Sequence, residues 1–220
     1  VALFSLEISS DNLISQMLSS ETGISSYQLR RGRLQPHEWE ILNNNLDNLS
    51  NAPIYIEDTP SLSISDLKIR VSKLVEEENV NLIVINNLQL MTIKSSSTVS
   101  RKEEINTISR NLKNLAKELN IPIIALSELT NTVETRGGSK RPLLSDLREL
   151  GTIEQNADLV AFIYRPEYYG MMEWDDEDGT PCEGQGDIIV SKNRNGMLNN
   201  IRIKFTAHLA KFSDLDYEPF

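Results

Sequence analysis

An alternation of short apolar segments with longer amphipathic ones constrains the fold of this chain most. Five apolar segments predict β-strands, at residues 1–7, 53–57, 81–86, 122–127 and 158–164. Three intervening stretches repeat apolar residues every three or four positions, which predicts helices whose apolar side chains face a core. These residues are Trp39, Leu42, Leu46 and Leu49; Ile64, Leu67, Val71 and Leu74; and Ile105, Ile108, Leu112, Leu115 and Leu119. The alternation is typical of an α/β fold with a mostly parallel sheet that helices cover on both faces.

The last third of the chain has a different pattern. A Gly-containing acidic stretch at 165–186 precedes two β-like runs at 187–192 and 200–206, which the turn sequence NRNG at 193–196 joins. Asn-Gly is a strong turn signal, so we expect antiparallel strands to extend the parallel sheet at its C-terminal end. The polar stretches 92–101 and 130–146 predict mobile loops.

Composition excludes several classes of protein. A length of 220 residues suits one α/β domain. No apolar run approaches the roughly 18 residues of a membrane span, and residues 1–6 do not resemble a signal peptide. Because Cys182 is the only cysteine, we expect no internal disulfide and a cytoplasmic location. His37 and His208 lie far from it in sequence, which argues against a structural zinc site.

The net charge of −10 argues against a nucleic-acid partner, but its distribution weakens that argument. Residues 173–187 contain seven acidic side chains and no basic one, so the net charge of the remaining residues is about −3. Arg136, Lys140, Arg141 and Arg148 form a locally basic stretch. That stretch is either a contact for nucleic acid or a solubilising loop.

Chemistry is expected just beyond the strands, because parallel α/β sheets bind ligands at the carboxyl ends of their strands. The polar residues there are Glu7, Asn86, Asn87, Ser127 and Glu128, with Lys192 and Arg194 further along. Five of these residues have a plainer interpretation: a solvated strand end for Glu7, turn residues for Asn86 and Asn87, and a surface pair for Lys192 and Arg194. On a strand, Lys192 and Arg194 would point to the same face.

Taken together and in order, six segments resemble one family. They are FSLE at 4–7, INNLQLM at 85–91, SRNLKNLAKEL at 109–119, SDLRE at 145–149, GTIEQNAD at 151–158 and KNRNG at 192–196. They look like the successive motifs of the DnaB-type replicative DNA helicases, and the resemblance extends from residue 1 to about residue 213.

The resemblance implies a RecA-like motor domain that assembles as a homo-hexameric ring and moves along single-stranded DNA. ATP and Mg²⁺ would bind between adjacent subunits, and primase and a helicase loader are candidate family partners. By position, Glu7 would polarise the attacking water, and Asn86 takes the place of the Walker B aspartate that holds the hydrated Mg²⁺. Glu128 stands where a glutamine senses the γ-phosphate, and Ser5 and Gln89 would border the nucleotide.

Two further groups of residues take their roles from the resemblance. Lys192 and Arg194 would reach the ATP of the neighbouring subunit, with Arg194 as the arginine finger; the planar guanidinium suits phosphate geometry. The DNA-contacting candidates are Asn131, Arg136, Arg148, Glu149 and Gly151.

The chain departs from the family pattern at several chemical positions. No glycine is followed by lysine, so these residues contain no Gly-x-x-x-x-Gly-Lys-Ser/Thr loop, and we expect a motor domain truncated on its N-terminal, phosphate-loop side. The uncharged Asn86 should hold Mg²⁺ less firmly. An ionised Glu128 about 4 Å from a phosphate charge would cost roughly 4 kcal/mol, unless it is protonated or paired. Asn131 replaces an arginine common in the family.

Three functions therefore remain open. The first is an ATP-dependent replicative helicase, which retention of Glu7, Lys192 and Arg194 favours. The second is a catalytically degenerate ring subunit or partner-binding module, which Asn86 and Glu128 favour. The third is a RecA-like ATPase of recombination or repair, which the long match over 145–158 disfavours.

Overall fold

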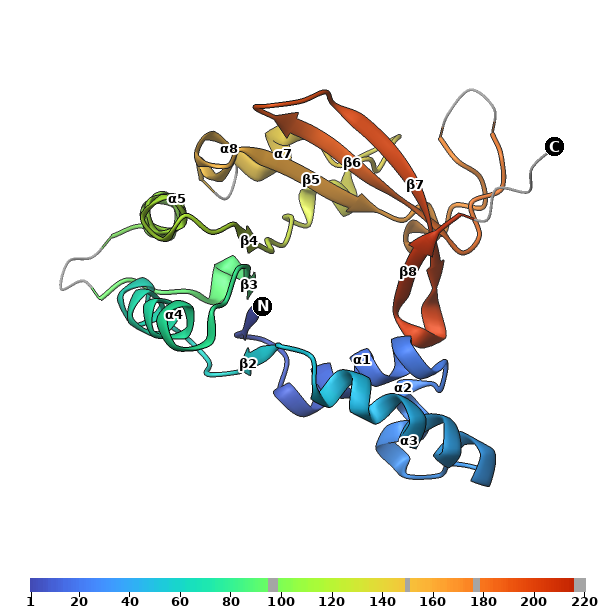
Figure 1. Cartoon of the computed structure of the whole chain (residues 1–220). Coiled ribbons are helices and arrows are strands. Elements are labelled where there is room, and N and C mark those ends of the chain that lie inside the picture. The colour runs from blue at the N-terminus through green and yellow to red at the C-terminus, as the bar shows by residue number, and fades with distance from the viewer. Residues whose placement is uncertain (95–98, 149–150, 176–178, 216–220) are drawn as a thin grey trace. The chain divides into compact units, whose positions relative to one another are not determined.

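The computed structural model describes residues 1–94, 99–148, 151–175 and 179–215 of the chain (Figure 1). These residues form two compact units. Unit 1 contains Val1–Ile14, Asn51–Thr130 and Leu147–Ala157, and unit 2 contains Ser15–Ser50, Asn131–Asp146 and the residues from Asp158 onward. None of the described helices is long and apolar enough to cross a membrane.

Unit 1 is built on a four-stranded parallel sheet. Its strands are β1 (Ala2–Ser5), β2 (Tyr55–Glu57), β3 (Ile83–Asn86) and β4 (Ile123–Ala125), in the order β2-β1-β3-β4. Ala2 lies opposite both Tyr55 and Ile83, and Ile83 lies opposite Ile123. Each strand falls inside one of the predicted apolar segments, so these four predictions are confirmed.

Two long helices cover one face of this sheet, α4 (Ile64–Glu78) and α5 (Arg101–Leu119), which run on the same side of β3 and β4 (Figure 1). Phe4 and Ile85 of the sheet pack with Leu67 of α4 and Ile108 of α5 in one buried cluster. The alternate side chains point the other way, and Ile124 is 48% exposed. The helices α4 and α5 of unit 1 thus cover this face of the sheet, in keeping with the expected parallel sheet flanked by helices.

Both long helices begin at serine caps, and unit 1 also contains short helices. Ser63 accepts a hydrogen bond from the backbone N–H of Asp66, and Ser100 forms a capping box with Glu103. The short helices are η1 (Leu88–Leu90), α7 (Leu144–Arg148), which spans the boundary with unit 2, and α8 (Ile153–Asn156). Asn156 of α8 donates to the hydroxyl of Ser109 on α5 at 2.7 Å.

Unit 2 contains an antiparallel sheet of its own. Its strands are β5 (Leu159–Tyr164), β6 (Gln185–Asn193), β7 (Asn199–Thr206) and β8 (Lys211–Asp214), in sequence order. Assigning 158–164 to the parallel sheet was wrong, because β5 pairs antiparallel with β6 and Tyr164 lies opposite Asp187. The continuous apolar run LVAFIY looks like a strand buried on both faces, yet its burial alternates, with Val160, Phe162 and Tyr164 inside. The predicted antiparallel strands at the C-terminal end are confirmed, as a separate sheet.

The remaining helices are α1 (Ser10–Thr22), which begins in unit 1, and α2 (Ser26–Arg31), α3 (Pro36–Ser50), α6 (Thr132–Thr135), η2 (Pro166–Tyr169) and η3 (Ala207–Leu209). In α3, Leu42 is buried as predicted, but Trp39 and Leu46 are 47% and 39% exposed, so the apolar repeat is not a fully core-facing stripe.

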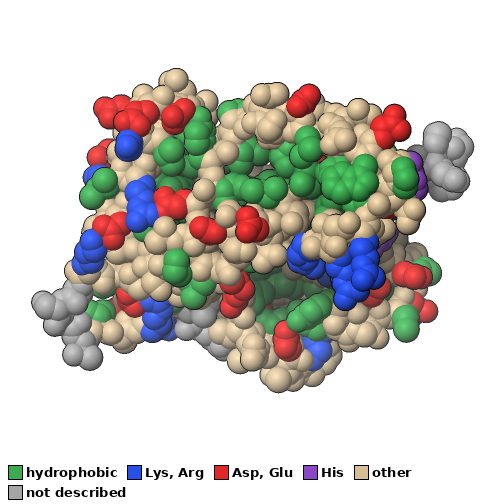
Figure 2. Space-filling view, turned by 90° about the horizontal axis from the view of Figure 1, so that it is seen from below, with side chains coloured by type: hydrophobic (Ala, Val, Ile, Leu, Met, Phe, Trp, Pro, Cys, Tyr) green, Lys and Arg blue, Asp and Glu red, His purple; other side chains and the backbone are tan. Residues whose placement is uncertain are grey.

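Figure 2 shows apolar side chains mixed with charged ones over the face that it draws. The predicted loop at 130–146 contains α6, while 95–98 of the predicted loop at 92–101 lie outside the described residues.

Replacement of Leu67 by alanine tests the packing of α4. Leu67 is fully buried, and the variant loses apolar burial and leaves a cavity. We expect the free energy of unfolding, measured with urea, to fall by about 2–5 kcal/mol. Ile69→Ala is the matched control, because Ile69 lies on the same helix and is 69% exposed; its change should stay within about 0.5 kcal/mol. Equal effects of the two variants would contradict the packing described here.

Candidate functional site

The carboxyl edge of the parallel sheet gathers four of the polar residues that the sequence singled out. Ser5 pairs with Asn86 at the ends of β1 and β3, and the N–H of Leu6 donates to the carbonyl of Asn86 at 2.5 Å. The N–H of Leu126, just after β4, donates to the carbonyl of Ile85 at 2.9 Å. These bonds bring Glu7, Asn86, Asn87 and Glu128 to one edge, as expected for parallel strands.

The carboxamide of Asn87 joins the two carboxylates at this edge. Its Nδ2 donates to Oε2 of Glu7 at 3.1 Å and to Oε1 of Glu128 at 3.0 Å. Its Oδ1 accepts from the backbone N–H of Leu90 at 3.1 Å and so caps η1. Asn87 is 4% exposed and follows a cis peptide bond from Asn86. The sequence drew attention to Asn87 only as a neighbour of Asn86, yet it is the central hydrogen-bonding group here.

Gln89 holds the residues beyond β4. Its Nε2 donates to the hydroxyl of Ser127 at 2.8 Å and to the carbonyl of Glu128 at 3.0 Å, and its Oε1 accepts from the N–H of Glu128 at 3.3 Å. Arg101 in turn donates to the carbonyls of Gln89 and Met91. The carboxamide of Gln89 thus fixes the backbone of Glu128, and its contact with nucleotide stays a prediction from the resemblance.

Ser5 and Asn86 line the same edge in different ways. Ser5 is buried, and its hydroxyl donates to the carbonyl of Ile8 at 2.6 Å, which fixes the turn after β1. Asn86 is half-buried at the end of β3. In the described part of the chain, no three His, Cys, Asp or Glu side chains gather closely enough to hold a metal ion.

Lys192 and Arg194 belong to unit 2. Lys192 lies on β6, but Arg194 follows the end of that strand, so the argument that both point to one strand face does not apply. Arg194 Nη1 donates to Asp158 Oδ1 at 2.9 Å, and its N–H donates to the Asp158 carbonyl, also at 2.9 Å. The two side chains are 46% and 49% exposed. Such an exposed pair contributes little stability, so it holds Arg194 only loosely.

Two basic residues of 131–146, Arg136 and Lys140, form their bonds within this segment. Arg136 forms an ion pair with the buried Asp146 and donates to the carbonyl of Arg141 at 3.1 Å. Lys140 donates to the carbonyls of Glu134 and Arg136. The carbonyl of Asn131 accepts from Thr135 at the start of α6. Arg136, a DNA-contacting candidate, thus has a structural role in this chain.

The other DNA-contacting candidates lie at or near a gap in the described residues. Arg148 ends α7, and its side chain lies outside the described part, as does the whole of Glu149. Gly151 has φ +135°, and a Cβ there would overlap Oδ1 of Asn106 on α5. That oxygen accepts from the N–H of Thr152 at 2.5 Å, so Gly151 allows residues 151–152 to approach α5 closely.

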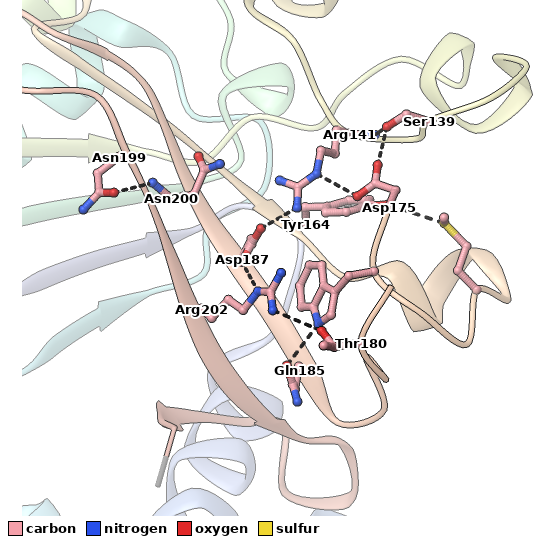
Figure 3. Close-up of polar contacts among 12 residues, drawn as sticks. Ser139, Arg141, Tyr164, Asp175, Thr180, Gln185, Asp187, Asn199, Asn200 and Arg202 are labelled. Carbon is pink, nitrogen blue, oxygen red and sulfur yellow. Dashed lines mark hydrogen bonds and ion pairs between the residues drawn. The ribbon is translucent and has the colours of Figure 1, made fainter. Parts of the chain in front are cut away.

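Arg141 organises the interior of unit 2, which the sequence did not predict. It donates to Oδ1 of Asp175 and to Oδ2 of Asp187, both at 2.8 Å (Figure 3). Its guanidinium lies over the rings of Tyr164 and Trp174, at 5.1 and 5.7 Å from their centroids. Two carboxylates of the acidic residues 173–187 are therefore counter-ions for an internal arginine.

Burial and charge shift the ionisation of this cluster. Burial alone would raise the pKa of Asp175, but hydrogen bonds from Ser139 and Arg141 outweigh it, and the pKa is lowered from 3.8. Burial, with the charge of Asp175 nearby, raises the pKa of Tyr164 to about 12. Burial also raises the pKa of the Cys182 thiol, so that thiol is a poor nucleophile.

Comparison with solved structures identifies the fold as that of RecA-like helicase ATPase domains, the class that we expected. One solved structure, described as an ATPase domain, superimposes with a TM-score of 0.86 at 29% sequence identity, over 98% of this chain and 74% of that one. A DnaB-like replicative helicase, described together with its interactions with primase, gives a TM-score of 0.85 at 29% identity, over 98% of this chain and 50% of that one.

Sequence comparison places the chain within a family. The model of the DnaB-like helicase C-terminal domain matches residues 1–214, and the chain belongs to that family. It is 44% identical to the replicative DNA helicase DnaB of Geobacillus stearothermophilus and 40% identical to the replicative DNA helicase DnaC of Bacillus subtilis, over 98% of this chain in each case. The match spans 46% of the length of each of these relatives.

Replacement of Asp175 by asparagine tests the Arg141 cluster through pH. A carboxylate whose pKa is lowered by folding contributes stability above its ordinary pKa of 3.8 and loses it as the pH falls through the lowered value. At pH 7 we expect Asp175→Asn to lower the free energy of unfolding by about 1–3 kcal/mol. The difference from wild type should shrink below about pH 4. Asp47→Asn serves as control, because Asp47 is exposed. A stability difference between Asp175→Asn and wild type that stays constant with pH would contradict the ion pair of Asp175 with Arg141.

Replacement of Gly151 by alanine tests the close approach of residues 151–152 to α5. The added Cβ meets Asn106 and forces an L-residue into a backbone region that it rarely adopts. Urea unfolding should show a loss of about 1–3 kcal/mol. Gly137→Ala, where nothing lies within 4 Å of the added atom, should change stability by less than about 0.5 kcal/mol. A neutral Gly151→Ala would rule the close approach out.

Proposed function

We propose that residues 1–220 belong to the motor domain of an ATP-dependent replicative DNA helicase, which moves along single-stranded DNA as a homo-hexameric ring. The observation that carries the proposal is the meeting of the Glu7 and Glu128 carboxylates at the carboxyl edge of the parallel sheet. In a domain of the DnaB-like family, this edge is where a nucleotide is expected. A carboxylate fixed at such an edge can orient a water molecule for attack on a phosphate.

The proposed nucleotide is ATP, with Mg²⁺ as its counter-ion. The donor set fits a hydrated Mg²⁺: the carboxylates of Glu7 and Glu128 meet at one edge, and Asn86 ends β3 at the same edge. Bound Mg²⁺ would neutralise charge that develops on the phosphate oxygens. Glu7 would orient the water, Glu128 would border the γ-phosphate, and Asn86 would accept a hydrogen bond from a metal-bound water.

Lys192 and Arg194 would complete the site of a neighbouring subunit. Arg194 is held by an exposed pair with Asp158, which is weak enough to exchange for a phosphate partner. An arginine supplied across an interface stabilises the charge of phosphoryl transfer. One subunit would thus supply Glu7 and its neighbour Arg194, which supports a ring in which each nucleotide lies between two subunits.

Contacts with DNA and other proteins follow by family. Asn131, Arg136, Arg148, Glu149 and Gly151 remain candidates for the surface that meets single-stranded DNA. Arg136 would also support that surface through its ion pair with Asp146. The solved relative described with primase supports primase as a partner of this chain, and a helicase loader is a further family expectation.

A second candidate function is a catalytically degenerate ring subunit. The uncharged Asn86 at the end of β3 favours it, because an amide holds a hydrated Mg²⁺ less firmly than a carboxylate does. Such a subunit would still offer Arg194 to the site of a competent neighbour.

The decisive measurement is ATP hydrolysis stimulated by single-stranded DNA, on the protein as its gene encodes it. We expect turnover that Glu7→Gln lowers by about 100-fold or more, because the water loses its orienting carboxylate. Arg194→Ala should lower it by about 1,000-fold or more. Mixing the two inactive variants should restore part of the activity, since a ring then holds intact sites formed by two different subunits.

Glu77→Gln is the control for these variants, because Glu77 is an exposed glutamate on α4. Absence of hydrolysis by the wild type, with hydrolysis by an Asn86→Asp/Glu128→Gln version, would replace the first function by the second. Hydrolysis that survives Glu7→Gln would remove the proposed role of this edge.

A further inference from the structure

We propose that Asn87 is a positioning residue that fixes both carboxylates of the nucleotide edge through one amide group. The proposal rests on the function proposed above and adds to it a residue to which no role was assigned. Asn87 would act through Glu7 and Glu128 without itself touching nucleotide.

The amide has one orientation that satisfies its surroundings. Its Oδ1 accepts from the N–H of Leu90 at 3.1 Å, so rotation of the carboxamide by half a turn would place an NH₂ group against that N–H. Nδ2 must therefore face the carboxylates. One N–H reaches Glu7 at 3.1 Å and the other reaches Glu128 at 3.0 Å, so both donors and the acceptor have partners.

The bridge suits two negative side chains that lie near each other. Carboxylates that share a site repel one another, and a buried hydrogen-bond donor between them offsets that repulsion. The bond to Asn87 occupies Oε2 of Glu7, which leaves Oε1 to accept from an attacking water. Glu128 is held twice, by Asn87 at its carboxylate and by Gln89 at its backbone.

The bridge also explains how the chain accommodates a glutamate at position 128. The family resemblance implies a neutral glutamine there, and a loose carboxylate beside a phosphate would be unfavourable. The buried amide of Asn87 gives that carboxylate a fixed partner on the protein side of the site. Asn87 and Glu128 therefore function as a pair.

The most informative variant is Asn87→Asp. The aspartate side chain has the size of asparagine and still offers an oxygen to the N–H of Leu90, but it replaces the NH₂ group that donates to both glutamates by a third carboxylate oxygen. On the protein as its gene encodes it, we expect kcat for DNA-stimulated ATP hydrolysis to fall by about 10- to 100-fold, with KM for ATP changed less than about threefold. The same substitution made in a Glu128→Gln background should cost at least about fivefold less, since the glutamine amide introduced there can donate to the new carboxylate.

A structural role alone would not produce this pattern. Asn87→Asp and Asn87→Ala should both melt as cooperative transitions well above the assay temperature in both backgrounds, so a loss of kcat would not reflect a loss of folded protein. Equal losses of kcat in the wild-type and Glu128→Gln backgrounds, or no loss at all, would overturn the proposal.

A second measurement, by NMR, does not depend on ATP hydrolysis. It therefore tests the Asn87 bridge separately from the proposed helicase function. In the ¹⁵N spectrum of the asparagine-labelled protein, Glu7→Gln and Glu128→Gln should each shift the side-chain NH₂ signals of Asn87. The signals of Asn195, an exposed turn residue, should not move. A shift in a protein that fails to hydrolyse ATP would uphold the bridge and reject the motor function; unshifted Asn87 signals would reject the bridge.

Discussion

The parallel pairing of β1, β3 and β4 is the constraint on which the candidate site depends. Parallel strands end at the same edge of a sheet, so a register that sets Ser5 beside Asn86 also brings Glu7 to Asn87. Backbone hydrogen bonds from Leu126 to Ile85 and from Leu88 to Leu126 extend the pairing beyond the end of β4. They place Glu128 at the same edge. A shift of one residue would turn these side chains to the opposite face, because strand side chains alternate.

The core beneath this edge keeps the register in place. Phe4 and Ile85 pack against α4 and α5, whose serine caps fix where each helix begins. Arg101, the first residue of α5, also binds the backbone of Gln89 and Met91. The same helix therefore covers the sheet and steadies the residues that hold Glu128.

Unit 2 shows how a strongly acidic stretch can serve structure. Asp175 and Asp187 come from either end of the stretch at 173–187, and both form ion pairs with Arg141. The guanidinium of Arg141 lies against Tyr164 and Trp174, where burial of an unpaired charge would be unfavourable. The two carboxylates compensate that charge. Part of the net charge of −10 is thus internal and says little about partners.

The sequence by itself determined the four parallel strands, the two long helices over them, the antiparallel end of the chain and the family. Local apolar periodicity, strong turn signals and long motifs carry that information. Only the tertiary structure decided that β5 pairs with β6, that Trp39 and Leu46 are exposed, and that Asn87 joins Glu7 to Glu128. Those features depend on contacts between residues far apart in sequence, and no local pattern specifies which distant groups meet.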